Sequence, residues 1–161
     1  MRRGLVGVAA LVATAAAFSA GSATGRVLVR CHTGDLSGRL GFIQGAAGSR
    51  FGPLVVKNRS YHTCTLFGFI GGQLYNAAGR KIATRLVRDH SVAERTIVLA
   101  PGRTARAELH WSAIPSGGAT RCPVPRSFAV TPPDERTQLR VRWTAGQVCG
   151  RGRIDVRPVR R

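Results

Sequence analysis

Histidine and cysteine are the residues of this chain whose spacing most readily suggests chemistry. His32 directly follows Cys31, and His62 lies two residues before Cys64. If these two cysteines are bonded to each other, both imidazoles share one neighbourhood, where they could act as copper or zinc ligands. Two ligands are too few for a protein metal site, and no carboxylate is evidently paired with them. We therefore predict no metal and no cofactor, and retain His32 and His62 as the only candidates.

The sequence contains no recognisable catalytic constellation. Ser116 lies in Ile-Pro-Ser-Gly-Gly, which differs from the G-x-S-x-G motif of a nucleophilic serine. Asp134 and Glu135 follow two prolines, which indicates an exposed turn and not a pair of carboxylates held across a cleft. We expect Glu108 and Asp155 to pair with outward-facing arginines on neighbouring strands. The sequence thus predicts a protein that is not an enzyme and has no catalytic residues.

The charge balance is strongly basic, with 25 lysines and arginines against 7 acidic residues. Such an excess attracts polyanions. For a protein that leaves the cytoplasm, we expect anionic cell-wall polymer or lipid headgroups as partners and do not expect nucleic acid. The simpler alternative is that arginine only fills solvent-facing positions, as lysine does in other proteins. The candidate anion-binding residues are the following outward-facing arginines: Arg106, Arg140, Arg142, Arg153 and Arg157.

Residues 1–25 have the layout of a secretory signal peptide. A short basic start precedes an uncharged apolar run over residues 4–20, and small residues follow. Cleavage within residues 17–25 would leave residues 26–161 as one domain, secreted or in the cell envelope; a retained membrane anchor is the alternative. A lipid anchor on Cys31 is not expected, because bacterial lipoboxes place a small residue before the cysteine and Arg30 stands there.

The domain contains four cysteines, an even number that indicates two disulfides in an exported protein. Three pairings are possible. We favour Cys31–Cys64 and Cys122–Cys149, because each closes a loop of about 30 residues. A four-thiolate zinc site is the alternative, but the sequence has no CxxC pair.

Short apolar runs separated by turn residues predict an all-β fold. Residues 51–58 and 64–69 are expected to form a central hairpin, and residues 95–111 a second hairpin around the proline–glycine turn at 100–103. Residues 31–39 are polar and turn-like, and a strand is expected at 40–44. Together these segments predict two packed antiparallel sheets.

Two segments alternate with a period of two, which places one set of side chains inside and the other in water. On the first, Ala105, Ala107, Leu109 and Trp111 are expected to face the core. On the second, Leu139, Val141 and Trp143 face inward while Arg140 and Arg142 face outward. Both tryptophans are therefore predicted to be core residues and not platforms for a sugar or a base.

The most specific motifs are the N-x(5)-C-T-L-x-G block from Asn58 to Gly68 and the Leu-Ala-Pro-Gly turn with the tryptophan-bearing segment after it. With the cysteine spacing and the Val-Thr-Pro-Pro-Asp segment, they make the chain similar to the DUF4232 family of exported actinobacterial proteins. The resemblance covers nearly all of residues 26–161. It implies an immunoglobulin-like β-sandwich in the cell envelope or secreted, and no particular activity. The resemblance also implies that many members are lipoproteins. This chain departs from them at Arg30, where a lipobox would have a small residue before the cysteine.

Three hypotheses about function follow from these observations. The first is a non-catalytic binding or interaction module with a basic surface. The second is a metal-binding or enzymatic envelope protein that uses His32 and His62. The third is a cationic, membrane-active secreted effector.

Overall fold

The computed structural model describes residues 28–118 and 120–161, so the predicted signal peptide lies outside the described residues. The described chain is nearly all β, as predicted, and its two helical segments are single 3-10 turns at Thr33–Asp35 and Gly150–Gly152. Within the described ranges, no helix is long and apolar enough to cross a membrane.

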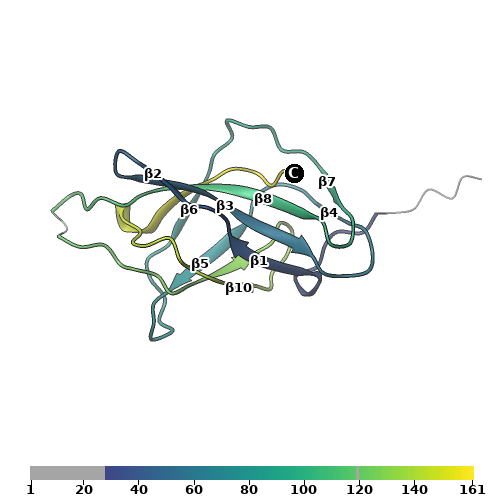
Figure 1. Ribbon diagram of the computed structural model, residues 1–161, viewed down its shortest axis with the longest axis horizontal. Coiled ribbons are helices and arrows are strands. Elements are labelled where there is room, and N and C mark those ends of the chain that lie inside the picture. Colours follow the sequence, from purple (N-terminus) through teal and green to yellow (C-terminus); the bar gives the residue numbers. More distant parts are fainter. Residues whose placement is uncertain (1–27, 119) are drawn as a thin grey trace, which may run out of the picture.

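The larger sheet has six strands (Figure 1). Their order is β1 (Leu36–Leu40), β3 (Ser49–Asn58), β8 (Thr104–Ser112), β11 (Arg153–Val156) and β6 (Arg85–Arg88), and β2 (Gln44–Ala46) also pairs with β3. All pairs in this sheet are antiparallel except β11 with β6, which is parallel. The prediction of purely antiparallel sheets is wrong at this pair, because the chain makes a long excursion between the two strands and returns in the same direction.

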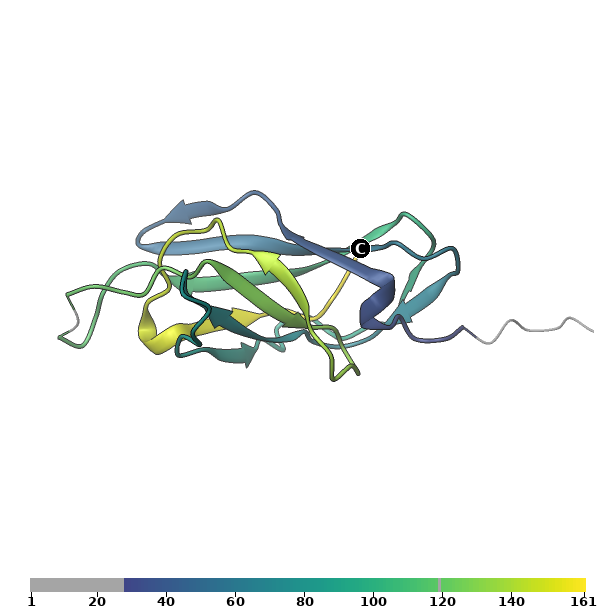
Figure 2. The ribbon, with the colours of Figure 1, turned by 90° about the horizontal axis from the view of Figure 1, so that it is seen from below.

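A three-stranded sheet lies against the larger sheet and gives the fold two layers (Figure 2). Its strands are β10 (Leu139–Arg142), β9 (Ser127–Thr131) and β5 (Gly71–Tyr75), in that order. A two-stranded sheet of β4 (Cys64–Leu66) and β7 (Ile97–Leu99) completes the fold. The architecture is sandwich-like, as predicted, and the immunoglobulin-like arrangement stays a prediction.

The core lies between the layers and is centred on aromatic rings. The ring centroids of Trp111 and Trp143 are 5.1 Å apart, and Phe128 meets Trp143 edge-on at 5.9 Å. All three side chains are buried, which confirms that the tryptophans are core residues. The predicted alternation on β8 and β10 is also confirmed, because their apolar positions face the core while Arg106, Arg140 and Arg142 are exposed.

Neither predicted hairpin forms. β3 pairs with β1, β2 and β8, whereas β4 pairs with β7 in a different sheet. The turn at Ala100–Arg103 does form, with the Arg103 amide donating to the Ala100 carbonyl at 3.1 Å and Gly102 at φ +75°. The strands on either side of this turn then join different sheets. Strands that are adjacent in sequence here therefore belong to different sheets and do not pair with each other.

Asn58 is a fully buried polar residue at the end of β3 and ties these layers together. Its Nδ2 donates to the carbonyls of His62 (2.8 Å) and Leu99 (2.9 Å). Its Oδ1 accepts from the backbone amide of Ser60 (2.9 Å) and from the Ser60 hydroxyl (2.7 Å). The side chain thus holds the loop between β3 and β4 against the end of β7, where no water could replace it.

Both favoured disulfides are present, Cys31–Cys64 and Cys122–Cys149. The first joins the N-terminal segment to β4, and both of its cysteines are 0% exposed. The second joins the segment before β9 to the segment before β11, and Cys122 is half-buried. The structure therefore confirms the pairing that the loop lengths favoured.

Candidate functional site

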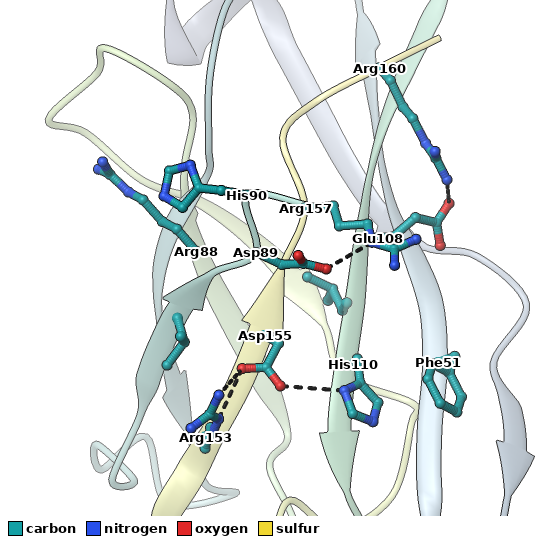
Figure 3. Close-up of a pocket in the computed structure, with 12 residues that line it drawn as sticks. Phe51, Arg88, Asp89, His90, Glu108, His110, Arg153, Asp155, Arg157 and Arg160 are labelled. Carbon is teal, nitrogen blue, oxygen red and sulfur yellow. Dashed lines mark hydrogen bonds and ion pairs between the residues drawn. The ribbon is translucent and has the colours of Figure 1, made fainter. Parts of the chain in front are cut away.

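A hollow of about 620 Å³ lies on the outer face of the six-stranded sheet (Figure 3). We call it the arginine groove, after four of the residues that line it: Arg88, Arg153, Arg157 and Arg160. Three carboxylates, two histidines and Phe51 also line it. These side chains come from β3, β6, β8 and β11 and from the segments after β6 and β11, so only the assembled sheet brings them together.

Strand register places one row of groove residues side by side. Phe51 of β3 is the partner of His110 of β8, which in turn is the partner of Asp155 of β11. The Phe51 and His110 rings stack with centroids 4.4 Å apart and 13° between their planes. His110 Nδ1 lies 3.3 Å from Asp155 Oδ2, and Arg153 Nη2 lies 2.8 Å from Asp155 Oδ1. Phe51 stays 42% exposed, which leaves an apolar edge open to a ligand.

A second set of ion pairs lies along the same groove. Arg157 Nε donates to Asp89 Oδ2 at 2.9 Å, and this hydrogen bond, with those from Ser91, holds the pKa of Asp89 far below its usual range. Arg160 Nη2 lies 3.6 Å from Glu108 Oε1. Glu108 and Asp155 thus pair with arginines, as expected, but not with arginines of neighbouring strands, because Arg153 is on the same strand as Asp155 and Arg160 follows β11. The Arg157 contact uses Nε, so its two terminal amino groups take no part in that bond and can donate elsewhere.

The five candidate anion-binding arginines do not form one cluster. Arg153 and Arg157 line the groove, and Arg106 lies on β8 in the same sheet. Arg140 and Arg142 lie on β10 in the opposite layer. There the Arg140 guanidinium donates to the Ser127 hydroxyl at 3.2 Å and lies 5.3 Å from the centroid of the Tyr75 ring. Their role in binding anions stays a prediction.

Most acidic residues lie beside a basic side chain. Six carboxylates lie within ion-pair distance of an arginine or histidine: Asp35, Asp89, Glu94, Glu108, Glu135 and Asp155. Among the described residues, the same ion pairs involve only four arginines, Arg30, Arg153, Arg157 and Arg160. Most of the positive charge is therefore left uncompensated and exposed to solvent.

The two metal candidates face different carboxylates. His32 Nδ1 lies 3.1 Å from Glu135 Oε1, whereas His62 Nε2 lies 3.5 Å from Asp35 Oδ2. Across residues 28–118 and 120–161, no three side chains of histidine, cysteine, aspartate or glutamate are grouped so that they could hold a metal ion. Each imidazole thus lies beside a carboxylate near the first disulfide.

Glu135 has a role that its sequence context did not indicate. Its carboxylate is only 9% exposed, so the expectation of an exposed turn is wrong for Glu135 and right for Asp134. It accepts hydrogen bonds from the Thr33 amide (3.0 Å) and the Thr33 hydroxyl (2.9 Å), and it lies 3.4 Å from Arg30 Nε. The Thr33 amide bond is the main reason that the pKa of Glu135 is lowered. The residue clamps the N-terminal segment to the loop before β10.

Acid should therefore loosen this clamp. Because the folded pKa of Glu135 is below the ordinary value of 4.5, its contribution to stability is present above pH 4.5 and is lost as the pH falls through the folded pKa. Urea unfolding should show E135Q less stable at neutral pH by about 1–2 kcal/mol and with a flatter loss of stability between pH 5 and 3. D134N is the exposed control and should behave as the wild type. Equal slopes for E135Q and the wild type would contradict the clamp.

Comparison with known proteins identifies a family but no characterised relative. No curated protein and no solved structure matches the chain. A family model described as a domain of unknown function (DUF4232) matches residues 31–160, which include both disulfides, Asn58 and the arginine groove. A match over most of the chain shows that this protein belongs to the DUF4232 family.

Proposed function

We propose that this protein is a non-catalytic binding module of the extracytoplasmic compartment, and that the arginine groove holds a phosphate- or carboxylate-bearing envelope polymer. The observation that carries the proposal is the concentration of four guanidinium groups around one hollow with an exposed aromatic edge. Oxyanions are the ligands that guanidinium groups bind best, and Phe51 offers a surface for the apolar face of a sugar or polyol.

The ion pairs of the groove favour binding because they hold the arginines in place. Arg153 and Arg157 are fixed on Asp155 and Asp89, so little side-chain entropy remains to be lost when an anion arrives. The terminal amino groups of Arg157 and the guanidinium of Arg88 add donors that these contacts do not occupy. A polymer with regularly spaced anions can meet several of them in succession.

The carboxylates of the lining favour binding over catalysis. All three are paired with arginines, which makes them less available as nucleophiles or general bases. The location rests on two disulfides, which persist in oxidising compartments, and on the signal peptide predicted from the sequence.

Titration with inorganic polyphosphate, beside a neutral dextran control, tests this function. The wild type should bind polyphosphate but not dextran, and the affinity should fall steeply between 50 and 300 mM salt, as charge contacts require. R153Q/R157Q should bind at least tenfold more weakly, because each lost charge-assisted contact is worth about 1.5–3 kcal/mol. R140Q/R142Q removes the same charge from the opposite layer and should retain most of the affinity. Equal losses in the two variants, or binding that salt leaves unchanged, would overturn the proposal.

A further inference from the structure

One end of the sandwich carries a second surface, separate from the groove. The described chain begins at this end (Figures 1 and 2). Residues 29–31 run beside β4, where the Thr65 amide donates to the Val29 carbonyl at 2.9 Å. The loop between β3 and β4 lies against the turn at 100–103, because the Asn58 amide donates to the Arg103 carbonyl at 3.0 Å. We call the exposed side chains of residues 28–31, of the loop between β3 and β4, of Phe67 directly after β4, and of the turn at 100–103 the end surface.

The end surface exposes large apolar side chains that the fold does not need in water. Tyr61 is 95% exposed at its loop, and Leu28, Val29 and Phe67 are 44%, 50% and 47% exposed. The Tyr61 ring meets the edge of His62 at 5.6 Å between centroids. A phenol ring that projects this far, with aliphatic and aromatic neighbours, is typical of side chains at a lipid headgroup layer.

Exposed basic residues lie on the same part of the chain. Lys57 is near the end of β3, Arg59 is in the loop that follows it, and Arg103 is in the turn that contacts Asn58. One carboxylate, Asp35, lies beside this loop: its Oδ2 is 3.5 Å from His62 Nε2, and the Arg59 amide donates to the Asp35 carbonyl at 2.7 Å. Exposed apolar side chains together with exposed lysine and arginine match an anionic bilayer, which attracts the charges and accepts the aromatic rings.

The sequence before the described chain points to the same occupant. The uncharged apolar run of residues 4–20 ends eight positions before Leu28, and eight residues span at most about 28 Å. If that run stays in the membrane, the end surface lies within this reach of the headgroups. If it is removed, the end surface itself supplies reversible binding.

We propose that the end surface docks the protein on an anionic lipid bilayer. This contact does not depend on the polymer-binding role of the groove, because it uses different residues at a different place on the fold. In this orientation neither face of the larger sheet contacts the lipid, and the arginine groove stays open to the space outside the membrane.

Vesicle flotation tests the docking. The protein is produced with its own N-terminal segment in an exporting host, and the exported form is mixed with vesicles of phosphatidylcholine alone or with 30% phosphatidylglycerol. The wild type should float with anionic vesicles at least tenfold better than with neutral ones. Y61S/F67S should lose most of this binding. K57Q/R59Q/R103Q should weaken it by about fivefold for each charge removed, and only on anionic vesicles.

The opposite end of the molecule provides a matched control. Ile114 and Val124 are 54% and 62% exposed, and Ile114 meets Gly48 at the tip of the β2–β3 hairpin, away from the end surface (Figure 1). I114S/V124S should float as the wild type does. Y61S alone serves if the double variant melts early, because a side chain exposed to this extent contributes little packing.

Three results would overturn the proposal: equal loss in the control and the Y61S/F67S variant, full binding by Y61S/F67S, or no preference for anionic vesicles. The second of these would point to another partner for the end surface. Polyphosphate titration of the same variants separates the two proposals, since Y61S/F67S should bind polyphosphate with unchanged affinity even where it no longer floats.

Discussion

Replacing Cys64 with serine is expected to destabilise the domain by more than the loss of the cross-link alone. The bond joins residues 33 positions apart. Without this cross-link the unfolded chain gains conformational entropy, which lowers the free energy of unfolding by about 3–4 kcal/mol. Both sulfurs are fully buried, so C64S also leaves a hydroxyl without a partner inside the core. Because single domains are stable by only about 5–15 kcal/mol, equilibrium unfolding should show a largely unfolded or weakly folded variant.

Thiol mapping gives this prediction its control. Alkylation of denatured C64S should label Cys31 and leave Cys122 and Cys149 protected by their own bond. C122S removes a bond of similar loop length whose first cysteine is half-buried, so its cost should stay near the cross-link term alone. A free Cys122 in C64S, or equal stability losses in the two variants, would contradict the structure at this point.

Asn58→Ala should also destabilise the domain strongly, although it removes only one small amide. The substitution leaves the buried Leu99 carbonyl and the Ser60 amide without their Asn58 partners, whereas the His62 carbonyl keeps the Ser60 hydroxyl as a donor at 3.1 Å. An unsatisfied buried group costs about 1–3 kcal/mol, so the expected loss is about 2–4 kcal/mol. Urea denaturation measures it directly.

Two further variants sharpen this result. N58D keeps the acceptor for Ser60 but turns a carboxylate oxygen toward two carbonyls, and it should be at least as unstable as N58A. N76A removes a turn contact at an exposed site, the hydrogen bond from the Arg80 amide, and should cost less than about 1 kcal/mol. If N58A cost no more than N76A, the bridging role of Asn58 would be wrong.

The alternation of side chains was predictable because it depends on local geometry. Every second residue of β8 faces the core, and the sequence pattern of Ala105, Ala107, Leu109 and Trp111 states this directly. The disulfide pairing was also within reach, since short loops were preferred over long ones. Side-chain alternation and disulfide pairing could be predicted without knowing which strands are neighbours in a sheet.

Strand pairing and one strand position were not predictable in the same way. The sequence predicts a polar turn over residues 31–39 and a strand at 40–44, whereas the strands are Leu36–Leu40 (β1) and Gln44–Ala46 (β2), so both predictions are wrong in their bounds. β1 packs closely on the opposite layer, because a Cβ on Gly38 would lie 2.6 Å from Leu139 Cδ1. Likewise, the polar residues after Asn58 resemble a hairpin turn. The Asn58 side chain instead donates a hydrogen bond to Leu99 at the end of β7, and the chain continues into β4, which pairs with β7 in another sheet. Both errors come from contacts between residues far apart in sequence.

The candidate site shows the same division. The arginines that line the groove could be recognised as outward-facing or as part of a basic C-terminal segment, but their assembly depends on β11 lying between β8 and β6. Glu135 carried no signal beyond its two preceding prolines, because its partners lie about 100 positions earlier in the chain, with Thr33 at a separation of 102.

The position of β11 inside the larger sheet determines when that sheet can form during folding. β11 fills the gap between β8 and β6, so the six-stranded sheet cannot close until residues 153–156 are free to enter it. During synthesis, β8 and β6 would each keep an unpaired edge until β11 is made. The domain therefore completes its larger sheet only after nearly all of its residues are available to fold.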